Sequence, residues 1–419
     1  MICMENFLIH GNKKLYGQIK VDSAKNSLLP LMAASIMCKN KVTIKNITYY
    51  EDVLNMIEIL KHLGVTLCKK ENNLIIDSST INKYDIPLEL SNKLRASIFF
   101  LGPLLSLFKK AKVAYPGGCQ IGARPIDIHI NGFSKMGAKI IDRHGIITAN
   151  GESMKSNNLC LPFPSVGATE NLIMASVFLK GSTTIVGAAK EPEIIDLCKF
   201  LNIMGAKISG MGSDTIHIHG VNELKGGDFE PIPDRIATGT YILAPIICGG
   251  EVEILNTKRK HIQPLIDLVK NNGCKIVASG DKIVVKGTGR PNGLGKIETM
   301  PYPFFPTDLS QPMSVLAALS NGNTMVVENL FENRFKHVPE LIKMGAKITI
   351  KDRTAFIEGV EHLYGANVIA PDLRGGAALV LAGLVAKGYT TISNIDLIDR
   401  GYYKLEEKLS GIGADIKRN

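Results

Sequence analysis

The sequence of 419 residues has no tryptophan and no run of apolar residues long enough to cross a membrane. Its longest uncharged apolar segments, 96–108 and 236–250, fall short of the roughly 18 residues that a membrane span requires. The N-terminal residues MICMENFLIH lack the basic segment and the cleavage site of a secretory signal peptide. The eight cysteines form no Cys-x-x-Cys pair and lie mostly in apolar surroundings. We therefore expect a cytoplasmic protein with mostly buried thiols and no membrane insertion.

Several common functional motifs are also missing. The sequence has no GxGxxG, Walker A, HExxH or GxSxG motif in a fitting context. It has no run of four or more lysines or arginines, which argues against a nucleic-acid-binding tail despite the net charge of +10. A lysine-rich solvated surface and a small anionic substrate both remain compatible with that charge.

The sequence does contain a repeat. A glycine, usually followed by alanine, recurs six times between an amphipathic helix and a strand. Neighbouring copies are 68 to 73 residues apart. At the end of a helix, glycine adopts a positive φ at little cost. The six glycines are Gly64, Gly137, Gly205, Gly273, Gly345 and Gly413.

The segments around these glycines predict one repeated unit, βαβαββ, of about 70 residues. Its first helix is apolar all round, its second helix is amphipathic, and its last two strands form a hairpin. Six units most simply form two globules of three, one spanning 22–233 and the other spanning 1–21 with 234–419. Because the sixth repeat lacks a hairpin, we expect the strands within 1–20 to complete it. The predicted first helices are 27–37, 171–179 and 377–386, the strands that follow them 41–47, 182–187 and 389–395, and the second helices 53–63, 194–204 and 338–344.

Charged residues gather where the first helix of each repeat begins. Five of the six helix starts carry a full charge, and four of these charges are positive. A cation at a helix N-terminus is unfavourable by ~0.3–1 kcal/mol, so an anionic ligand explains the pattern. The alternative is that these side chains face water or pair with aspartates. The six positions are Lys25, Arg95, Ser165 to Thr169, Arg235, Asp308 and Arg374.

A second set of arginines lies in the loops before the second helices, at Arg124, Arg334 and Arg400. The loop 116–127 is glycine-rich and also carries Cys119, which predicts a flexible lid. Arg124 and the nearby Lys112 would favour a reactive thiolate, although an incidental surface cysteine remains the alternative.

The motifs AKN, LRAS, PGGCQIGARPID, PSVGATEN, EPEIIDL, IPDRIATGTY, FPTD, ENRF, HVPEL, DLR and IDRGY lie in this order along the chain. Over essentially its whole length the sequence resembles the enolpyruvyl transferases. The resemblance implies an α/β fold, a two-domain inside-out α/β barrel built from six βαβαββ repeats. It implies transfer of enolpyruvate from phosphoenolpyruvate to the 3′-hydroxyl of UDP-N-acetylglucosamine, with release of phosphate. That reaction is the first committed step of peptidoglycan synthesis.

The resemblance also implies a role for each matching residue. Cys119 would protonate the methylene carbon, Asp308 would act on the sugar hydroxyl, and Lys25 and Arg400 would complete the catalytic set. Cations beside Asp308 favour its ionised form, so we expect it mainly to orient that hydroxyl. Phe163 replaces a lysine that some members have near the diphosphate. The substrate-binding residues would be Lys25, Asn26, Arg95, Arg124, Pro125, Ile126, Asp127, Ile128, Ser165, Val166, Gly167, Asp308, Arg334, Asp372, Arg374 and Arg400.

No metal or organic cofactor is implied, and a monomer is favoured. The lid cysteine suggests sensitivity to an epoxide antibiotic of the fosfomycin type. Two other functions stay open at this point. The sister enzymes that act on shikimate 3-phosphate share the repeats but lack the lid cysteine. A basic, repeat-built clamp would instead place its cations along helix faces.

Overall fold

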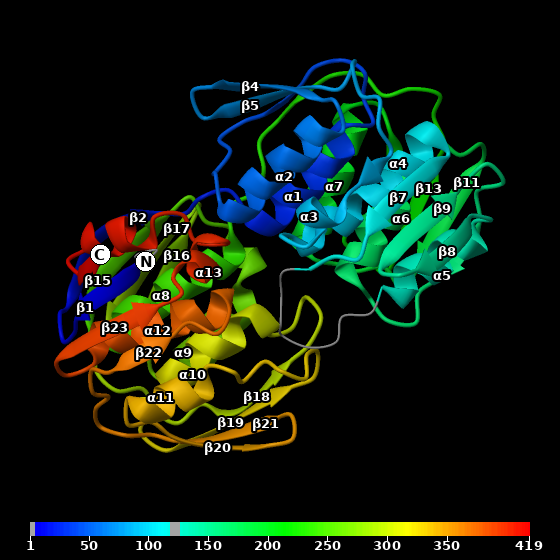
Figure 1. The fold of residues 1–419 in the computed structure, drawn as a ribbon. Helices are drawn as coiled ribbons and strands as arrows, with labels where there is room; N and C mark the ends of the chain where they lie inside the picture. The colour runs from blue at the N-terminus through cyan, green and yellow to red at the C-terminus, as the bar shows by residue number, and fades with distance from the viewer. Residues whose placement is uncertain (1–4, 118–125) are drawn as a thin grey trace. The chain divides into compact units, whose positions relative to one another are not determined.

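A computed structural model of the chain describes residues 5–117 and 126–419 (Figure 1). Within these ranges the chain forms two compact units. The central unit comprises residues 23–117 and 126–232, and the terminal unit comprises residues 5–22 and 233–419. Of the helices in these ranges, none has both the length and the apolar composition that crossing a membrane requires.

The third repeat shows the predicted βαβαββ order in one continuous segment. Strands β10 and β11 are parallel and joined across α6, while β11 and β12 both pair antiparallel with β13. Its elements are β10 (Asn158–Cys160), α6 (Val166–Ser176), β11 (Ser182–Val186), α7 (Pro192–Ile203), β12 (Lys207–Ser209) and β13 (Thr215–His219).

The first and second repeats complete the central unit. Strand β14 pairs parallel with β3, so the sheet of the first repeat takes its outer strand from the end of the unit. The first repeat contains α1 (Lys25–Ser35), β3 (Val42–Ile44), α2 (Glu51–His62), β4 (Thr66–Lys70), β5 (Asn73–Asp77) and β14 (Asp228–Phe229). The second contains β6 (Asp85–Ile86), α3 (Leu88–Ser91), a 3-10 helix (Arg95–Phe100), α4 (Leu101–Phe108), β7 (Lys110–Ala114), α5 (Asp127–Lys135), β8 (Lys139–Arg143) and β9 (Ile146–Asn150).

The terminal unit holds the other three repeats. The fourth contains β2 (Leu15–Lys20), α8 (Arg235–Cys248), β15 (Gly250–Leu255), a 3-10 helix (Arg259–His261), α9 (Gln263–Asn271), β16 (Lys275–Ser279) and β17 (Lys282–Gly287). The fifth contains β18 (Gly295–Thr299), a 3-10 turn (Thr307–Leu309), α10 (Ser310–Ala318), β19 (Asn323–Glu328), α11 (Val338–Lys343), β20 (Lys347–Lys351) and β21 (Thr354–Glu358). The sixth contains β22 (Asn367–Ile369), α12 (Leu373–Val385), β23 (Tyr389–Ser393), α13 (Asp396–Asp399), α14 (Leu405–Ser410), β24 (Asp415–Arg418) and β1 (Asn6–His10).

The two N-terminal strands belong to different sheets. Strand β1 pairs with β23 and β24 and completes the sixth repeat, as predicted. The same prediction is wrong for β2, which pairs parallel with β15 in the fourth repeat. The reason is that the second segment of the terminal unit starts at residue 233 and α8 begins almost at once, at Arg235. The fourth repeat therefore has no preceding strand of its own, and residues 15–20 supply it.

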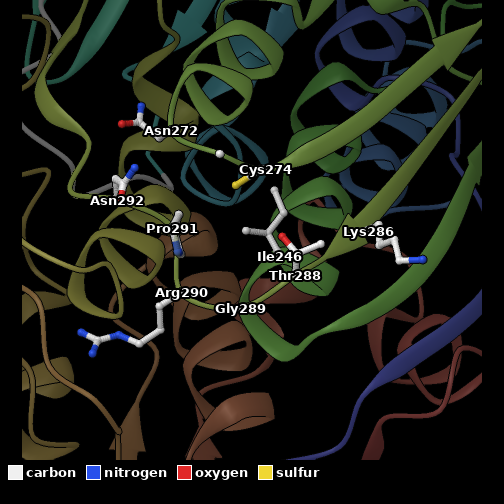
Figure 2. A pocket seen from close by; sticks show the side chains of 10 residues that line it. Ile246, Asn272, Cys274, Lys286, Thr288, Gly289, Arg290, Pro291 and Asn292 are labelled. Atoms are coloured by element: carbon white, nitrogen blue, oxygen red, sulfur yellow. The ribbon is translucent and has the colours of Figure 1, made fainter.

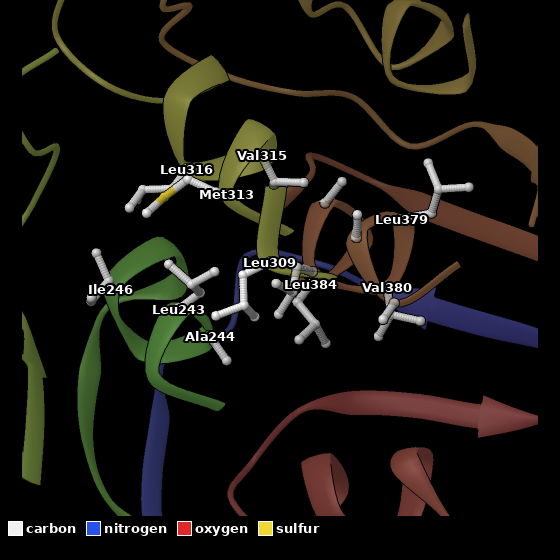
Figure 3. Close-up of a cluster of buried hydrophobic side chains, with 14 of the residues drawn as sticks. Leu243, Ala244, Ile246, Leu309, Met313, Val315, Leu316, Leu379, Val380 and Leu384 are labelled. Atoms are coloured by element: carbon white, nitrogen blue, oxygen red, sulfur yellow. The ribbon is translucent and has the colours of Figure 1, made fainter. Parts of the chain in front are cut away.

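Each unit buries its apolar helices and leaves one face of each sheet outside. In the terminal unit, α8, α10 and α12 pack on one another, with Leu243, Leu316 and Leu384 among the side chains that meet (Figure 3). Helices that are apolar all round are stable only when they are covered on all sides. The sheets provide that cover with alternating buried and exposed residues, as in β19 and β23.

The repeated glycines lie where the sequence predicts them. All six follow a second helix and have φ between 91° and 107°. A side chain there would be strained, which explains why the glycine, rather than the alanine after it, recurs in every copy.

Candidate active site

The structure places the six singled-out positions at equivalent helix starts. Lys25, Arg95 and Arg235 are the first residues of α1, the 3-10 helix of the second repeat and α8. Arg374 is the second residue of α12, and Asp308 lies in the 3-10 turn directly before α10. Ser165 is the N-cap of α6, where its Oγ accepts from Ala168 N at 3.4 Å.

Two of the cationic helix starts have an aspartate cap beside them. Oδ1 of Asp234 accepts from the N–H groups of Ile236 and Ala237, both at 2.8 Å. Oδ1 of Asp372 accepts from Arg374 N at 2.9 Å and Gly375 N at 3.0 Å. Each cap satisfies free N–H groups and puts a negative charge at the positive end of the helix. Asp372 is among the predicted residues, whereas sequence reasoning missed Asp234, although Asp-Arg and Asp-Leu-Arg were both visible before the helices.

In the terminal unit, Asp308 is held between two arginines. Arg334 Nη2 lies 2.5 Å from Oδ1, and Arg374 Nη2 lies 3.1 Å from Oδ2. Both arginine side chains are 2% exposed, and the Asp308 side chain is 26% exposed. The Asp308 carboxylate thus offsets part of the cost of burying two cations and keeps an accessible edge.

The sequence left open whether the cations at the helix starts bind an anionic ligand or pair with aspartates. Arg374 does form an ion pair with an aspartate, Asp308. Burial by itself lowers the pKa of Arg374, but Tyr402 and Asp308 together raise it above its usual value. Within the described ranges, its Nη1 atom is buried and has no hydrogen-bond partner. The guanidinium carbon of Arg374 also lies 5.2 Å from the centre of the Tyr402 ring.

Gln311 connects the arginines to the cap of α12. Its Nε2 donates to the backbone oxygen of Arg334 and to Oδ2 of Asp372, both at 3.0 Å. Gln311 is fully buried. Sequence reasoning missed this residue, because its partners come from segments more than 20 residues away.

Arg400 and Arg235 are the other predicted cations of the terminal unit. Arg400 is the C-cap that follows α13, and its neighbour Asp399 accepts two hydrogen bonds from Arg418, at 2.7 and 2.9 Å. The guanidinium of Arg235 lies 5.7 Å from the centre of the Tyr302 ring.

The central unit carries the other predicted residues that the structure describes. Lys25 Nζ lies 3.0 Å from Asp52 Oδ2, and both side chains are largely buried. Asn26 follows Lys25 in α1 and is partly buried. Asp127 is the first residue of α5, Ile126 is its N-cap, and Ile128 lies in its first turn. Val166 and Gly167 form the first turn of α6. The predicted residues Cys119, Arg124 and Pro125 lie outside the described residues.

Three glutamates of the central unit were not singled out from the sequence. Glu170 lies in α6 and is 1% exposed, while Glu191 and Glu193 lie at the start of α7. Burial, together with the charges of Glu193 and Glu191, raises the pKa of Glu170 well above its usual value. Burial also raises the pKa of the Cys198 thiol to about 12, and Glu170 adds to that rise.

A small pocket of about 110 Å³ lies elsewhere in the terminal unit (Figure 2). It is bordered by Ile246, 272–274, Lys286 and 288–292, and among the described residues none of the predicted site residues lines it. Arg290 at its edge donates to the backbone oxygens of Leu319 and Ser320, at 2.9 and 2.8 Å. These carbonyls follow the end of α10, so Arg290 serves there as a helix cap. Across 5–117 and 126–419, no cluster of His, Cys, Asp and Glu is arranged to hold a metal ion.

The family described as EPSP synthase (3-phosphoshikimate 1-carboxyvinyltransferase) matches residues 9–409. The chain therefore belongs to this family of carboxyvinyltransferases. A relative from Carboxydothermus hydrogenoformans, named UDP-N-acetylglucosamine 1-carboxyvinyltransferase 2, is 46% identical over 417 residues, which is 99% of each chain. A relative of the same name from Caldanaerobacter subterraneus subsp. tengcongensis is 43% identical over 415 residues, covering 99% of this chain and 100% of the relative.

Among solved structures, the enolpyruvyl transferase NikO from Streptomyces tendae matches with a TM-score of 0.89 at 24% identity. The match covers 99% of both chains and shows likeness of fold. These comparisons confirm the predicted enolpyruvyl transferase family, the enzyme class of transferase and the inside-out α/β barrel of six repeats.

Proposed function

We propose that this enzyme transfers the enolpyruvyl group of phosphoenolpyruvate to the 3′-hydroxyl of UDP-N-acetylglucosamine and releases inorganic phosphate. The observation that carries this proposal is the set of full-length relatives, 43% to 46% identical, that are named UDP-N-acetylglucosamine 1-carboxyvinyltransferases. In a cell that makes peptidoglycan, this reaction would be the first committed step of its synthesis.

The charges at the helix starts support substrates that carry several negative charges. Phosphoenolpyruvate has a phosphate and a carboxylate, and UDP-N-acetylglucosamine has a diphosphate. Helix N-termini and buried guanidinium groups both bind such oxygens. We assign Lys25, Arg124 and Arg400 to phosphoenolpyruvate, with Arg95, Arg334 and Arg374 adding positive charge. Arg374 would contribute its charge from the start of α12, where it is paired with Asp308.

The sugar nucleotide would lie on the central unit. We assign the uridine to residues 124–128 and the diphosphate to the start of α6, at Ser165, Val166 and Gly167. These residues form the N-cap and first turn of α6. The free N–H groups of a helix N-terminus suit the oxygens of a diphosphate. Asn26 would bind substrate beside Lys25, and Asp372 would hold the start of α12.

The reaction proceeds by addition and then elimination. The 3′-oxygen bonds to C2 of phosphoenolpyruvate while a proton adds to C3, which gives a phospholactoyl tetrahedral intermediate. The bond from C2 to the phosphate oxygen then breaks and C3 loses a proton, which restores the double bond. Cys119 would supply the proton to C3, and the arginines would stabilise the negative charge of the carboxylate and of the leaving phosphate.

Asp308 would act on the sugar 3′-hydroxyl. Because each of its carboxylate oxygens contacts an arginine, the ionised form is favoured and the group is held in one orientation. Its partly exposed edge can accept a hydrogen bond from a hydroxyl. We therefore assign Asp308 mainly to orienting that hydroxyl, with proton transfer late in the addition step.

Phosphate release from phosphoenolpyruvate tests the proposal. The purified protein should release phosphate only when UDP-N-acetylglucosamine is present, and Cys119→Ala should remove most of that release. Release without the sugar nucleotide, or equal release with shikimate 3-phosphate, would overturn the proposal and favour the sister activity. If UDP-N-acetylglucosamine protects Cys119 from an alkylating reagent, the assigned lid is supported. Retention of the protein on DNA without such protection would favour a clamp.

We also propose that the enzyme is cytoplasmic, free of metal and organic cofactors, and monomeric. Six cysteines within the described ranges are unpaired, as expected in a reducing compartment. Dialysis against a chelator should leave the rate of phosphate release unchanged, and light scattering during gel filtration should give the mass of one chain. A dimer mass or a chelator-sensitive rate would contradict these assignments.

A further inference from the structure

Glu328, the last residue of β19, is fully buried and accepts hydrogen bonds with both carboxylate oxygens. Its Oε1 atom accepts from the hydroxyl of Thr299 at 2.8 Å, from Leu330 N at 2.9 Å and from Phe331 N at 3.2 Å. Leu330 and Phe331 begin the loop that leads to Arg334. One oxygen of Glu328 therefore fixes the start of that loop against the end of β18.

The second oxygen reaches the segment that carries Asp308. Oε2 accepts from the hydroxyl of Thr307 at 2.8 Å and from the hydroxyl of Ser310 at 3.5 Å. These two residues flank Asp308 and Leu309, and Ser310 also donates to the backbone oxygen of Thr307 at 2.8 Å. The carboxylate thus joins the turn before α10 to the loop after β19.

The partners that the structure gives Glu328 are hydroxyl and backbone N–H groups, and they carry no charge. A buried carboxylate loses its hydration, and neutral donors replace that loss only when several converge on it. Apolar side chains could fill the same space more simply. The arrangement is therefore better explained by the need to hold two segments in one geometry than by stability alone.

Both segments end at the charged groups of the candidate site. The hydroxyl of Thr307 donates to Glu328, and the carbonyl oxygen of Thr307 accepts from Arg334 Nε at 3.2 Å. Arg334 in turn contacts Asp308, the neighbour of Thr307. A shift at Glu328 would therefore move the acid and its arginine relative to each other, although Glu328 contacts neither of them.

We propose that Glu328 is a positioning residue that holds Asp308 and Arg334 in the geometry needed for the addition step. The proposal rests on the function proposed above. Glu328 would act through Thr307 on one side and through the N–H groups of Leu330 and Phe331 on the other.

The test compares Glu328→Gln and Glu328→Ala with Thr324→Val in the full-length enzyme. Thr324 is a matched control, because it lies on the same strand, is 3% exposed and accepts a backbone hydrogen bond from Leu294 at 3.0 Å. Glu328→Gln keeps the shape but replaces one acceptor oxygen with a donor. We expect kcat to fall about tenfold in Glu328→Gln and about 100-fold in Glu328→Ala, with KM for phosphoenolpyruvate unchanged within about twofold. Thr324→Val should keep kcat within about twofold at an equal folded fraction.

A double-mutant cycle separates positioning from a general loss of structure. If Glu328 acts through Asp308, Glu328→Gln should reduce kcat by less than about threefold in an Asp308→Asn background. An unchanged tenfold effect in that background, or equal losses in Glu328→Gln and Thr324→Val, would overturn the proposal. Failure of the wild-type enzyme to release phosphate with UDP-N-acetylglucosamine would instead overturn the proposed function. The two failures are therefore distinguishable.

Discussion

Acidification from about pH 7.5 to about pH 5 should destabilise the terminal unit through His337. This residue precedes α11, is fully buried, and places its Nε2 atom 2.7 Å from Ser314 Oγ. Burial is the main cause that lowers the pKa of His337 from 6.5 to about 4, and the charge of Arg334 adds to the effect, whereas the charge of Asp372 and a hydrogen bond with the Arg334 backbone oppose it. In the folded protein the imidazole therefore stays neutral over a range in which the unfolded chain is protonated.

The sign and the size follow from this difference. Between pH 6.5 and about 4, the unfolded state binds a proton at His337 that the folded state does not, so stability falls as the pH falls. Each pKa unit between the unfolded and folded states corresponds to about 1.4 kcal/mol of unfolding free energy. The full loss of stability for a pKa lowered from 6.5 to about 4 is therefore about 3 kcal/mol. About 2 kcal/mol of it should be lost by the time the pH reaches about 5.

Urea denaturation of the wild type and of His337→Gln measures this loss. Glutamine keeps a polar group near Ser314 but does not titrate. The unfolding free energy of the wild type minus that of His337→Gln should decrease by about 2 kcal/mol when the pH is lowered from about 7.5 to about 5. The reasoning is refuted if the two proteins lose stability in parallel over that range.

Three further predictions concern separate parts of the chain. Asp308→Asn should lower kcat at least about 100-fold while the protein still binds UDP-N-acetylglucosamine in calorimetry, and near-normal turnover would contradict the assigned role. Iodoacetamide at neutral pH should label the exposed Cys68 but spare Cys198 until urea is added, because burial raises the pKa of the Cys198 thiol to about 12. Mass spectrometry of the labelled peptides measures the modification, and labelling of Cys198 before urea is added would contradict the prediction. Arg418→Lys should cost about 1–3 kcal/mol in urea denaturation, because lysine cannot reproduce the two hydrogen bonds to Asp399, and an unchanged midpoint would count against it.

The repeat was predictable because its signals are local. Gly64 and its five counterparts mark helix ends, and the positive φ that selects glycine is a property of one residue and its neighbours. The place of β2 was not predictable in the same way. Its partner β15 lies more than 200 residues away, and nothing within 15–20 distinguishes the fourth sheet from the sixth.

The candidate site divides along the same line. The position of Arg374 at a helix start could be predicted from its distance to the repeated glycine, since helix lengths recur. Its pairing with Asp308 depends on a contact between residues 66 positions apart, and the acceptor role of Glu328 depends on the ends of three separate segments. The pairing of Lys25 with Asp52 is of the same kind. Sequence spacing indicates which residues begin equivalent helices, but the contacts between repeats require the packed structure.

Product analysis tests the central claim most directly. Purified enzyme would be incubated with phosphoenolpyruvate and UDP-N-acetylglucosamine, and the sugar nucleotide would be characterised by mass spectrometry and NMR. The proposal predicts a sugar nucleotide that carries one enolpyruvyl ether on its 3′-oxygen, formed together with an equal amount of phosphate. An unchanged sugar nucleotide, or an enolpyruvyl group that appears on shikimate 3-phosphate in a parallel reaction, would contradict it.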